Sequence, residues 1–265
     1  MWCLIKFVIP LLLLFPALIW PGTGTVAVVE IHGSIGEDVS ARDVVDILDS
    51  LEGHDAVILD IDSPGGSTVD SHEIVRAVSR LGIPKVALVR GSATSGAYWV
   101  AAATDHIVAD ELSFVGSLGA LMSFLSVEGL ARKYGVSAEV ITYPGNKSFG
   151  SVFRDLTPQE REYAERLTRS AAEYLNSSIS ELRPSAARYF TGYPFLARDA
   201  PELVDSYGGF REAVRVAEEL SGKRLRPEFI SPQKGIRELF REAIGLRADA
   251  PFNFFKLAFQ LPYYV

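Results

Sequence analysis

The chain has 265 residues, of which 48% are hydrophobic and 22% charged, and a formal net charge of −7. A chain of this length and composition can bury a core without disulfides or a structural metal. Its acidic balance leaves no basic surface for nucleic acid, which is not expected as a partner. The single cysteine, Cys3, excludes an internal disulfide, and the four histidines lack metal-ligand spacing, so no metal or other cofactor is expected.

The N-terminus contains an apolar run, FVIPLLLLFPALIW over residues 7–20, that carries no charge. The run is short for a spanning helix, and Pro10 and Pro16 disfavour a regular one, so a cleaved signal peptide is the alternative. Because the following residues fit a cleavage site poorly, we favour an uncleaved anchor over residues 1–22. The positive-inside rule keeps Lys6 in the cytoplasm and predicts a single-pass cell-membrane protein whose remainder is extracytoplasmic.

After the anchor, short β-rich runs alternate with helical patterns. Strands are predicted over residues 26–31, 56–62, 85–91, 106–110 and 138–143, and helices over residues 40–51, 68–81, 122–134, 158–182 and 210–220, with another beginning at Ser95. This alternation predicts an α/β fold on a mainly parallel sheet, over residues 23–225. Residues 226–265 are predicted to form a helical and apolar tail that packs on a neighbouring subunit or the membrane interface.

Ser95 lies between small residues at the start of an apolar predicted helix. A helix N-terminus offers unpaired N–H groups and a positive dipole end, so an oxyanion formed beside Ser95 would meet donors already in place. Taken alone, however, Ser95 is more simply interpreted as a helix cap. The residues around it decide between a nucleophile and a cap.

A second motif, Ser-Pro-Gly-Gly over residues 63–66, ends a predicted strand before a helix. The double glycine, Gly65 and Gly66, allows the backbone to approach a ligand and direct N–H groups toward it, although an ordinary strand-to-helix turn has the same composition. Beside Ser95, this turn would supply one oxyanion donor, and the N–H of Gly96 would be the natural second.

A serine nucleophile needs a base. His32, His72 and His106 are each explained by a loop, a helix surface or a strand, whereas Lys147 lies in a loop of small and apolar residues. With an ordinary lysine pKa near 10.4, only about 1 in 2,500 side chains is neutral at pH 7. A lysine base therefore requires burial that lowers the pKa, and Phe149 and its apolar neighbours are compatible with such burial.

The order and spacing of several motifs resemble the signal peptide peptidase A family, membrane-anchored relatives of Clp protease with a Ser/Lys dyad. The resemblance covers most of residues 25–220 and is carried by SPGG (63–66), ATSGAY (93–98), GSLGA (116–120), GNKS (145–148) and FRDLT (153–157). It implies an α/β, Clp protease/crotonase-like fold of repeated β-β-α units, with the N-terminal membrane anchor.

The resemblance also implies roles for individual residues. Ser95 matches the family's nucleophile, Lys147 its general base, and Ser117 the serine that helps to orient the lysine. The glycines at 65, 66 and 96 match the oxyanion-hole backbone. Ala97 departs from the family, which has a second glycine there.

The resemblance therefore implies a membrane-bound serine endopeptidase that degrades apolar peptides, such as cleaved signal peptides, and assembles into a homo-oligomeric ring. Three different functions remain open. A stomatin-cleaving membrane protease shares the dyad but is expected to have a shorter interval between serine and lysine. A crotonase-like acyl-CoA enzyme also uses paired backbone N–H groups, and an inactive membrane scaffold would use neither.

Overall fold

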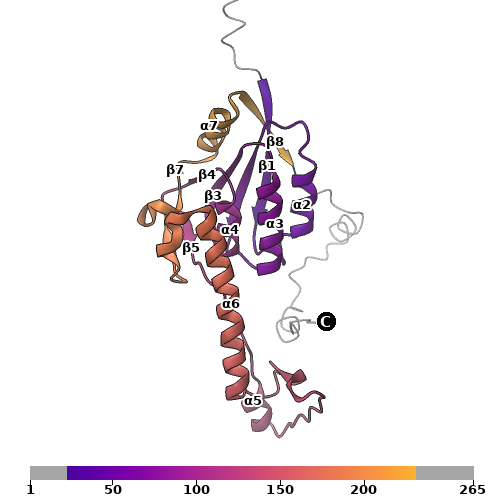
Figure 1. Ribbon diagram of the computed structural model, residues 1–265. Coiled ribbons are helices and arrows are strands. Elements are labelled where there is room, and N and C mark those ends of the chain that lie inside the picture. The colour runs from indigo at the N-terminus through magenta and orange to yellow at the C-terminus, as the bar shows by residue number, and fades with distance from the viewer. Residues whose placement is uncertain (1–22, 231–265) are drawn as a thin grey trace, which may run out of the picture. The chain divides into compact units, whose positions relative to one another are not determined.

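The computed structural model describes residues 23–230, which divide into two compact units (Figure 1). The first unit comprises residues 23–118 and 175–230, and the second comprises residues 119–174. The predicted anchor over residues 1–22 and most of the predicted C-terminal tail lie outside the described residues. Between residues 23 and 230, no helix is both long and apolar enough to cross a membrane.

The first unit is built on an eight-stranded sheet. Six strands follow the order β6-β5-β3-β2-β1-β8, while β4 also pairs with β3 and carries β7 on its other side. The strands are β1 (Thr23–His32), β2 (Ala56–Ser63), β3 (Lys85–Thr94), β4 (His106–Ala109), β5 (Phe114–Gly116), β6 (Pro194–Leu196), β7 (Ser206–Tyr207) and β8 (Arg224–Ile230). Every pairing is parallel except that of β5 with β6. The mainly parallel α/β architecture is therefore as predicted.

Two details differ from the prediction. Strand β8 continues to Ile230, beyond the predicted domain end at residue 225, because these residues pair with β1 at the edge of the sheet. From β1 to α4, single strands alternate with single helices, which differs from the repeated β-β-α order that the resemblance implied. Each parallel pair needs a crossover connection, and one helix supplies it.

Helices cover both faces of this sheet: α2 (Ala41–Asp49), α3 (Thr68–Arg80) and α4 (Gly96–Ala102) belong to one buried cluster, and α7 (Phe210–Ser221) to another. Alternate residues of β1 face opposite sides of the sheet, since Ala27 and Val29 lie in the first cluster and Val26 in the second. Strands buried on both faces read as continuous apolar runs, which is why the sequence predicted them well.

Helix α4 is the most deeply buried helix of the first unit, since all its residues from Gly96 to Ala102 are buried. Two polar side-chain atoms tie it to distant segments. The Tyr98 hydroxyl donates to the Leu203 carbonyl at 3.0 Å, and Trp99 Nε1 donates to Ser178 Oγ at 3.0 Å. The N-terminus of α4, where Ser95 lies, is therefore held by the core of the first unit.

The remaining connections of the first unit contain three short 3₁₀ segments, η3 (Pro184–Tyr189), η4 (Ala197–Asp199) and η5 (Pro201–Leu203). The second unit contains α5 (Glu128–Lys133), the 3₁₀ turn η2 (Gly145–Ser148) and the first part of α6 (Pro158–Leu182). In this unit the Phe149 ring packs edge-on against two other rings, with centroids 5.3 Å from Phe124 and 5.5 Å from Tyr163.

Two predictions in the second unit need correction. The helix predicted over residues 122–134 is limited to α5, and the strand predicted over residues 138–143 is not formed. Val140 and Ile141 are 53% and 90% exposed. A strand requires a pairing partner, and residues 119–174 contain no other strand to pair with this run.

Candidate active site

Ser95 lies at the turn between β3 and α4 in a backbone conformation that is rare for a residue with a side chain, with φ of 54° and ψ of −123°. Such strain costs on the order of 1–3 kcal/mol and occurs mostly at functional sites. The Ser95 side chain makes no capping hydrogen bond to α4. Ser95 therefore occupies the N-cap position of α4 without capping the helix through its side chain, and its hydroxyl is left for another use.

The Pro-Gly-Gly turn lies directly against Ser95, because β2 and β3 are paired where Ser63 meets Ala93. A Cβ atom placed on Gly65 would lie 2.8 Å from the Gly96 nitrogen and 3.0 Å from Ser95 Cβ. Gly65 also has a φ of +93°. Only glycine permits both this conformation and this close approach of the two backbones.

Two backbone donors beside Ser95 are unpaired. Among residues 23–230, neither the Gly66 N–H nor the Gly96 N–H donates a hydrogen bond, although their neighbours at Ser67 and Ser95 do. The Gly66 nitrogen lies 3.8 Å from the point that a Cβ on Gly96 would occupy. Two unpaired N–H groups close to a serine residue have the composition of an oxyanion hole.

Ser117 belongs to the same neighbourhood, since the Ser95 N–H donates to the carbonyl of the preceding residue, Gly116, at 2.8 Å. Like Ser95, Ser117 has a positive φ, of 52°. Its N–H donates to the Tyr193 carbonyl at 2.9 Å, and its hydroxyl donates to the Gly192 carbonyl at 3.2 Å. The first unit thus brings together the predicted residues at 65, 66, 95, 96 and 117.

Lys147, the sixth predicted residue, belongs to the second unit and lies in η2, where its N–H donates to the Pro144 carbonyl at 3.0 Å. Its side chain is exposed among residues 23–230, so these residues do not bury Lys147 as the sequence predicted. The nearby Phe149 packs against Phe124 and Tyr163 instead of covering Lys147.

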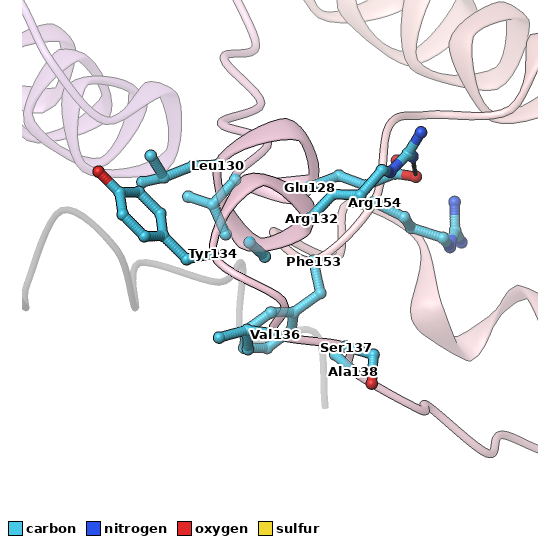
Figure 2. A pocket seen from close by; sticks show the side chains of 11 residues that line it. Glu128, Leu130, Arg132, Tyr134, Val136, Ser137, Ala138, Phe153 and Arg154 are labelled. Carbon is cyan, nitrogen blue, oxygen red and sulfur yellow. Dashed lines mark hydrogen bonds and ion pairs between the residues drawn. The ribbon is translucent and has the colours of Figure 1, made fainter.

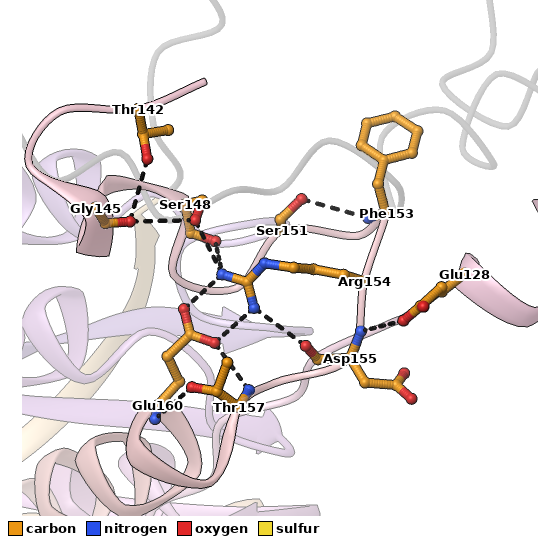
Figure 3. Close-up of polar contacts among 10 residues, drawn as sticks. All are labelled: Glu128, Thr142, Gly145, Ser148, Ser151, Phe153, Arg154, Asp155, Thr157 and Glu160. Atoms are coloured by element: carbon orange, nitrogen blue, oxygen red, sulfur yellow. Dashed lines mark hydrogen bonds and ion pairs between the residues drawn. The ribbon is translucent and has the colours of Figure 1, made fainter. Parts of the chain in front are cut away.

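A polar cluster supports the turn of Lys147 (Figure 3). The motifs GNKS and FRDLT contain part of it, but they did not predict its contacts with Glu160. Arg154 hydrogen-bonds Ser148, at the end of η2, and forms an ion pair with Glu160 at 2.6 Å. Hydrogen bonding to Arg154 lowers the pKa of Glu160 to about 2. The pattern Thr157-x-x-Glu160, a capping box at the start of α6, was the sequence signal that could have identified Glu160.

The three histidines that could replace Lys147 as a base have other contacts in the first unit. His106 Nε2 lies 2.9 Å from Ser206 Oγ, and His32 Nε2 lies 3.5 Å from Asp60 Oδ1. His72 stacks on Trp99 with ring centroids 4.9 Å apart, and burial lowers its pKa. Each of these contacts suits a structural role.

The second unit also contains an open, largely apolar pocket of about 630 Å³ (Figure 2). Its apolar walls come from α5, the segment after it and the loop before α6, and include Leu130, Tyr134, Val136 and Phe153. These four side chains are between 49% and 70% exposed. The pocket therefore offers apolar surface at which an unfolded apolar segment could bind.

Several proteins named as proteases are similar in sequence to this chain. A candidate protease of Methanocaldococcus jannaschii is 33% identical over 68% of this chain and 62% of its own length. Protease 4 of Haemophilus influenzae is 29% identical over 75% of this chain and 35% of its own length. The chain thus spans less than two thirds of either relative. A protein of Enterococcus faecium named as signal peptide peptidase SppA is 37% identical over 31% of this chain and 24% of its own length.

The fold has a counterpart of known structure. A mutant of the 1510-N membrane-bound stomatin-specific protease, solved with a substrate peptide, superposes with a TM-score of 0.51 and 15% identity, over 85% of this chain and 99% of that chain. At this identity the likeness concerns the fold alone. The sequence match is more specific, since the model of peptidase family S49 covers residues 77–224, more than half of the chain. The predicted resemblance is confirmed, and this chain belongs to peptidase family S49.

Proposed function

We propose that this chain is a serine endopeptidase in which Ser95 is the nucleophile and Lys147 the general base. One observation carries the proposal: the uncapped, strained Ser95 lies beside the unpaired N–H groups of Gly66 and Gly96. Membership of family S49 supports the same reaction class.

The proposed chemistry is acyl transfer. Neutral Lys147 accepts the proton of the Ser95 hydroxyl as its oxygen attacks a peptide carbonyl carbon. The N–H groups of Gly66 and Gly96 stabilise the oxyanion, and the Lys147 ammonium then protonates the departing amine as the C–N bond breaks. The same lysine activates the water that hydrolyses the acyl-enzyme. This chemistry requires Lys147 to be shielded from water when substrate is bound.

The proposed substrates are apolar peptides, such as cleaved signal peptides, at the extracytoplasmic side of the cell membrane. The exposed apolar pocket of the second unit and the apolar residues 7–20 support this choice. We further propose that residues 1–22 anchor the chain in the membrane and that copies of the chain form a ring, which would restrict access to unfolded segments. A stomatin-type protease would have the same chemistry with a different substrate.

An acyl-CoA enzyme and an inactive scaffold would use the site differently. A crotonase-like acyl-CoA enzyme needs the paired N–H groups but not the Ser95 hydroxyl, and an inactive scaffold needs neither. Labelling with a serine-directed fluorophosphonate, followed by mapping of the modified peptide, separates them from a peptidase. We expect label on Ser95, its loss in Ser95→Ala, and loss of apolar-peptide cleavage in that variant and in Lys147→Ala. Unchanged cleavage by Ser95→Ala would refute the assignment.

A further inference from the structure

We propose that Arg154 is a positioning residue for Lys147, because its guanidinium fastens the turn that carries Lys147 to Glu160 at the start of α6. This proposal rests on the proposed function, in which Lys147 is the base. In this proposal, contacts of the loop around Lys147 help to position the reacting amine. The contacts that support it all lie within the second unit.

On the side of the turn, Arg154 binds the residue that follows Lys147. Its Nη2 atom donates to Ser148 Oγ at 2.9 Å and to the Ser148 carbonyl at 3.2 Å. The turn is closed by its own bonds as well, since Thr142 and Ser148 donate to the Gly145 carbonyl. Arg154 therefore holds one end of a compact turn, as Figure 3 shows.

On the opposite side, the same guanidinium forms a forked pair with Glu160, at 2.6 Å from Nη1 to Oε2 and 2.7 Å from Nη2 to Oε1. Glu160 is itself held, because its carboxylate accepts the Thr157 N–H at 2.9 Å. Since Glu160 lies in the first turn of the 25-residue α6, the Lys147 turn is attached to the longest helix within residues 23–230.

Burial distinguishes this pair from an ordinary surface ion pair. The Arg154 and Glu160 side chains are 34% and 12% exposed, whereas those of Arg166 and Glu162, a similar pair on α6, are 62% and 70% exposed. Planar, forked Arg–carboxylate bonds shielded from water fix geometry, while exposed pairs contribute little. A displacement of about 1 Å in a reacting group can cost about 100-fold in rate, so fastening the neighbour of Lys147 matters for catalysis.

The test compares Arg154→Met, Arg154→Lys and the matched control Arg166→Met in the full-length protein, with a fluorogenic apolar peptide as substrate. We expect Arg154→Met to lower kcat by about 100-fold with KM within about twofold. Arg154→Lys keeps the charge but cannot bind Ser148 and Glu160 in the same forked geometry, so kcat should fall about 10-fold. Arg166→Met should leave both constants unchanged.

A second comparison separates positioning from support of the fold. If Arg154 acts through Lys147, Arg154→Met should change the slow fluorophosphonate labelling of Ser95 by less than about twofold in a Lys147→Ala background. An equal loss in both backgrounds would overturn the proposal, as would wild-type kcat in Arg154→Met. Ser148→Ala, which leaves the Glu160 pair intact, should lower kcat several-fold, and an unchanged kcat would count against Arg154 acting through Ser148.

Failure of the proposed function and failure of the positioning role give different results. If Lys147→Ala cleaves the peptide as well as the wild type, the proposed function fails. If Lys147→Ala is inactive while Arg154→Met retains full kcat, only the positioning role of Arg154 fails.

Discussion

The Ser71 hydroxyl occupies the space that a side chain at Gly96 would need: a Cβ on Gly96 would lie 2.2 Å from Ser71 Oγ and 2.9 Å from Ser71 Cβ. Ser71 lies on α3 and is fully buried, and its hydroxyl has no hydrogen-bond partner among residues 23–230. The glycine after Ser95 is therefore required by its neighbour on another helix, and the Gly96 N–H depends on that close packing.

We expect Gly96→Ala to abolish peptide cleavage, because the new methyl group would displace α4 from α3 and move the Gly96 N–H. The double variant Gly96→Ala/Ser71→Gly should recover part of the activity, although glycine within α3 costs about 1 kcal/mol of stability. Cleavage rates and thermal unfolding of both variants test this. Failure of the second change to recover any activity, in a folded protein, would show that Ser71 is not the obstacle.

The unpaired Ser71 hydroxyl leads to a separate prediction. Ser71→Ala replaces the buried, unsatisfied hydroxyl by a hydrogen atom and so removes a desolvation penalty. The variant should therefore unfold with a free energy equal to or about 1 kcal/mol above that of the wild type. Denaturant unfolding measures it. Ser170, exposed on α6, offers a serine control. A loss of more than about 1 kcal/mol in Ser71→Ala alone would reveal a hydrogen bond that the hydroxyl makes.

Gly65→Ala tests the close approach of the Pro-Gly-Gly turn to Ser95. The alanine would be strained at a φ of +93°, and its Cβ would lie 2.8 Å from the Gly96 nitrogen. We expect a loss of about 1–3 kcal/mol in stability from the backbone conformation alone, and no detectable labelling of Ser95 by a fluorophosphonate. Gly53→Ala is a matched control for strain, since Gly53 has a φ of +94° and open space around it. Equal labelling of the two variants would contradict the role of Gly65 in the site.

The strain at Ser95 implies that activity and stability conflict there. Both Ser95→Ala and Ser95→Gly should be inactive, but only glycine adopts a φ of 54° without a steric penalty. Ser95→Gly should therefore be more stable than Ser95→Ala by about 1 kcal/mol in denaturant unfolding. The opposite order would mean that the strained conformation is not kept in solution.

The Glu160 ion pair predicts a pH dependence of stability. Hydrogen bonding to Arg154 lowers the folded-state pKa of Glu160 from 4.5 to about 2, so the pair contributes its full stabilisation above the unfolded-state pKa. This contribution is lost as the pH falls from about 4.5 through about 2. Melting temperatures of the wild type and Glu160→Gln should therefore differ most above about pH 5 and converge toward about pH 2. A constant difference across this range would contradict the assignment.

Much of the first unit followed from local patterns. The apolar runs that became β1, β2 and β3 were recognisable because their residues are buried on both faces of the sheet. The strand predicted over residues 138–143 does not form, because these residues are not buried in a sheet. Its residues have an apolar pattern, but no strand in residues 119–174 is present to pair with them.

By itself the sequence determined the order of strands and helices, the position of Ser95 at a helix start and the membership of its motifs in a protease family, since all three are encoded in contiguous residues. Only the tertiary structure decided that the Ser95 hydroxyl does not cap α4, that Ser71 occupies the space a side chain at Gly96 would need, and that Arg154 joins the Lys147 turn to Glu160. Those facts depend on how backbones and side chains approach one another across the fold, and no local spacing specifies such distances.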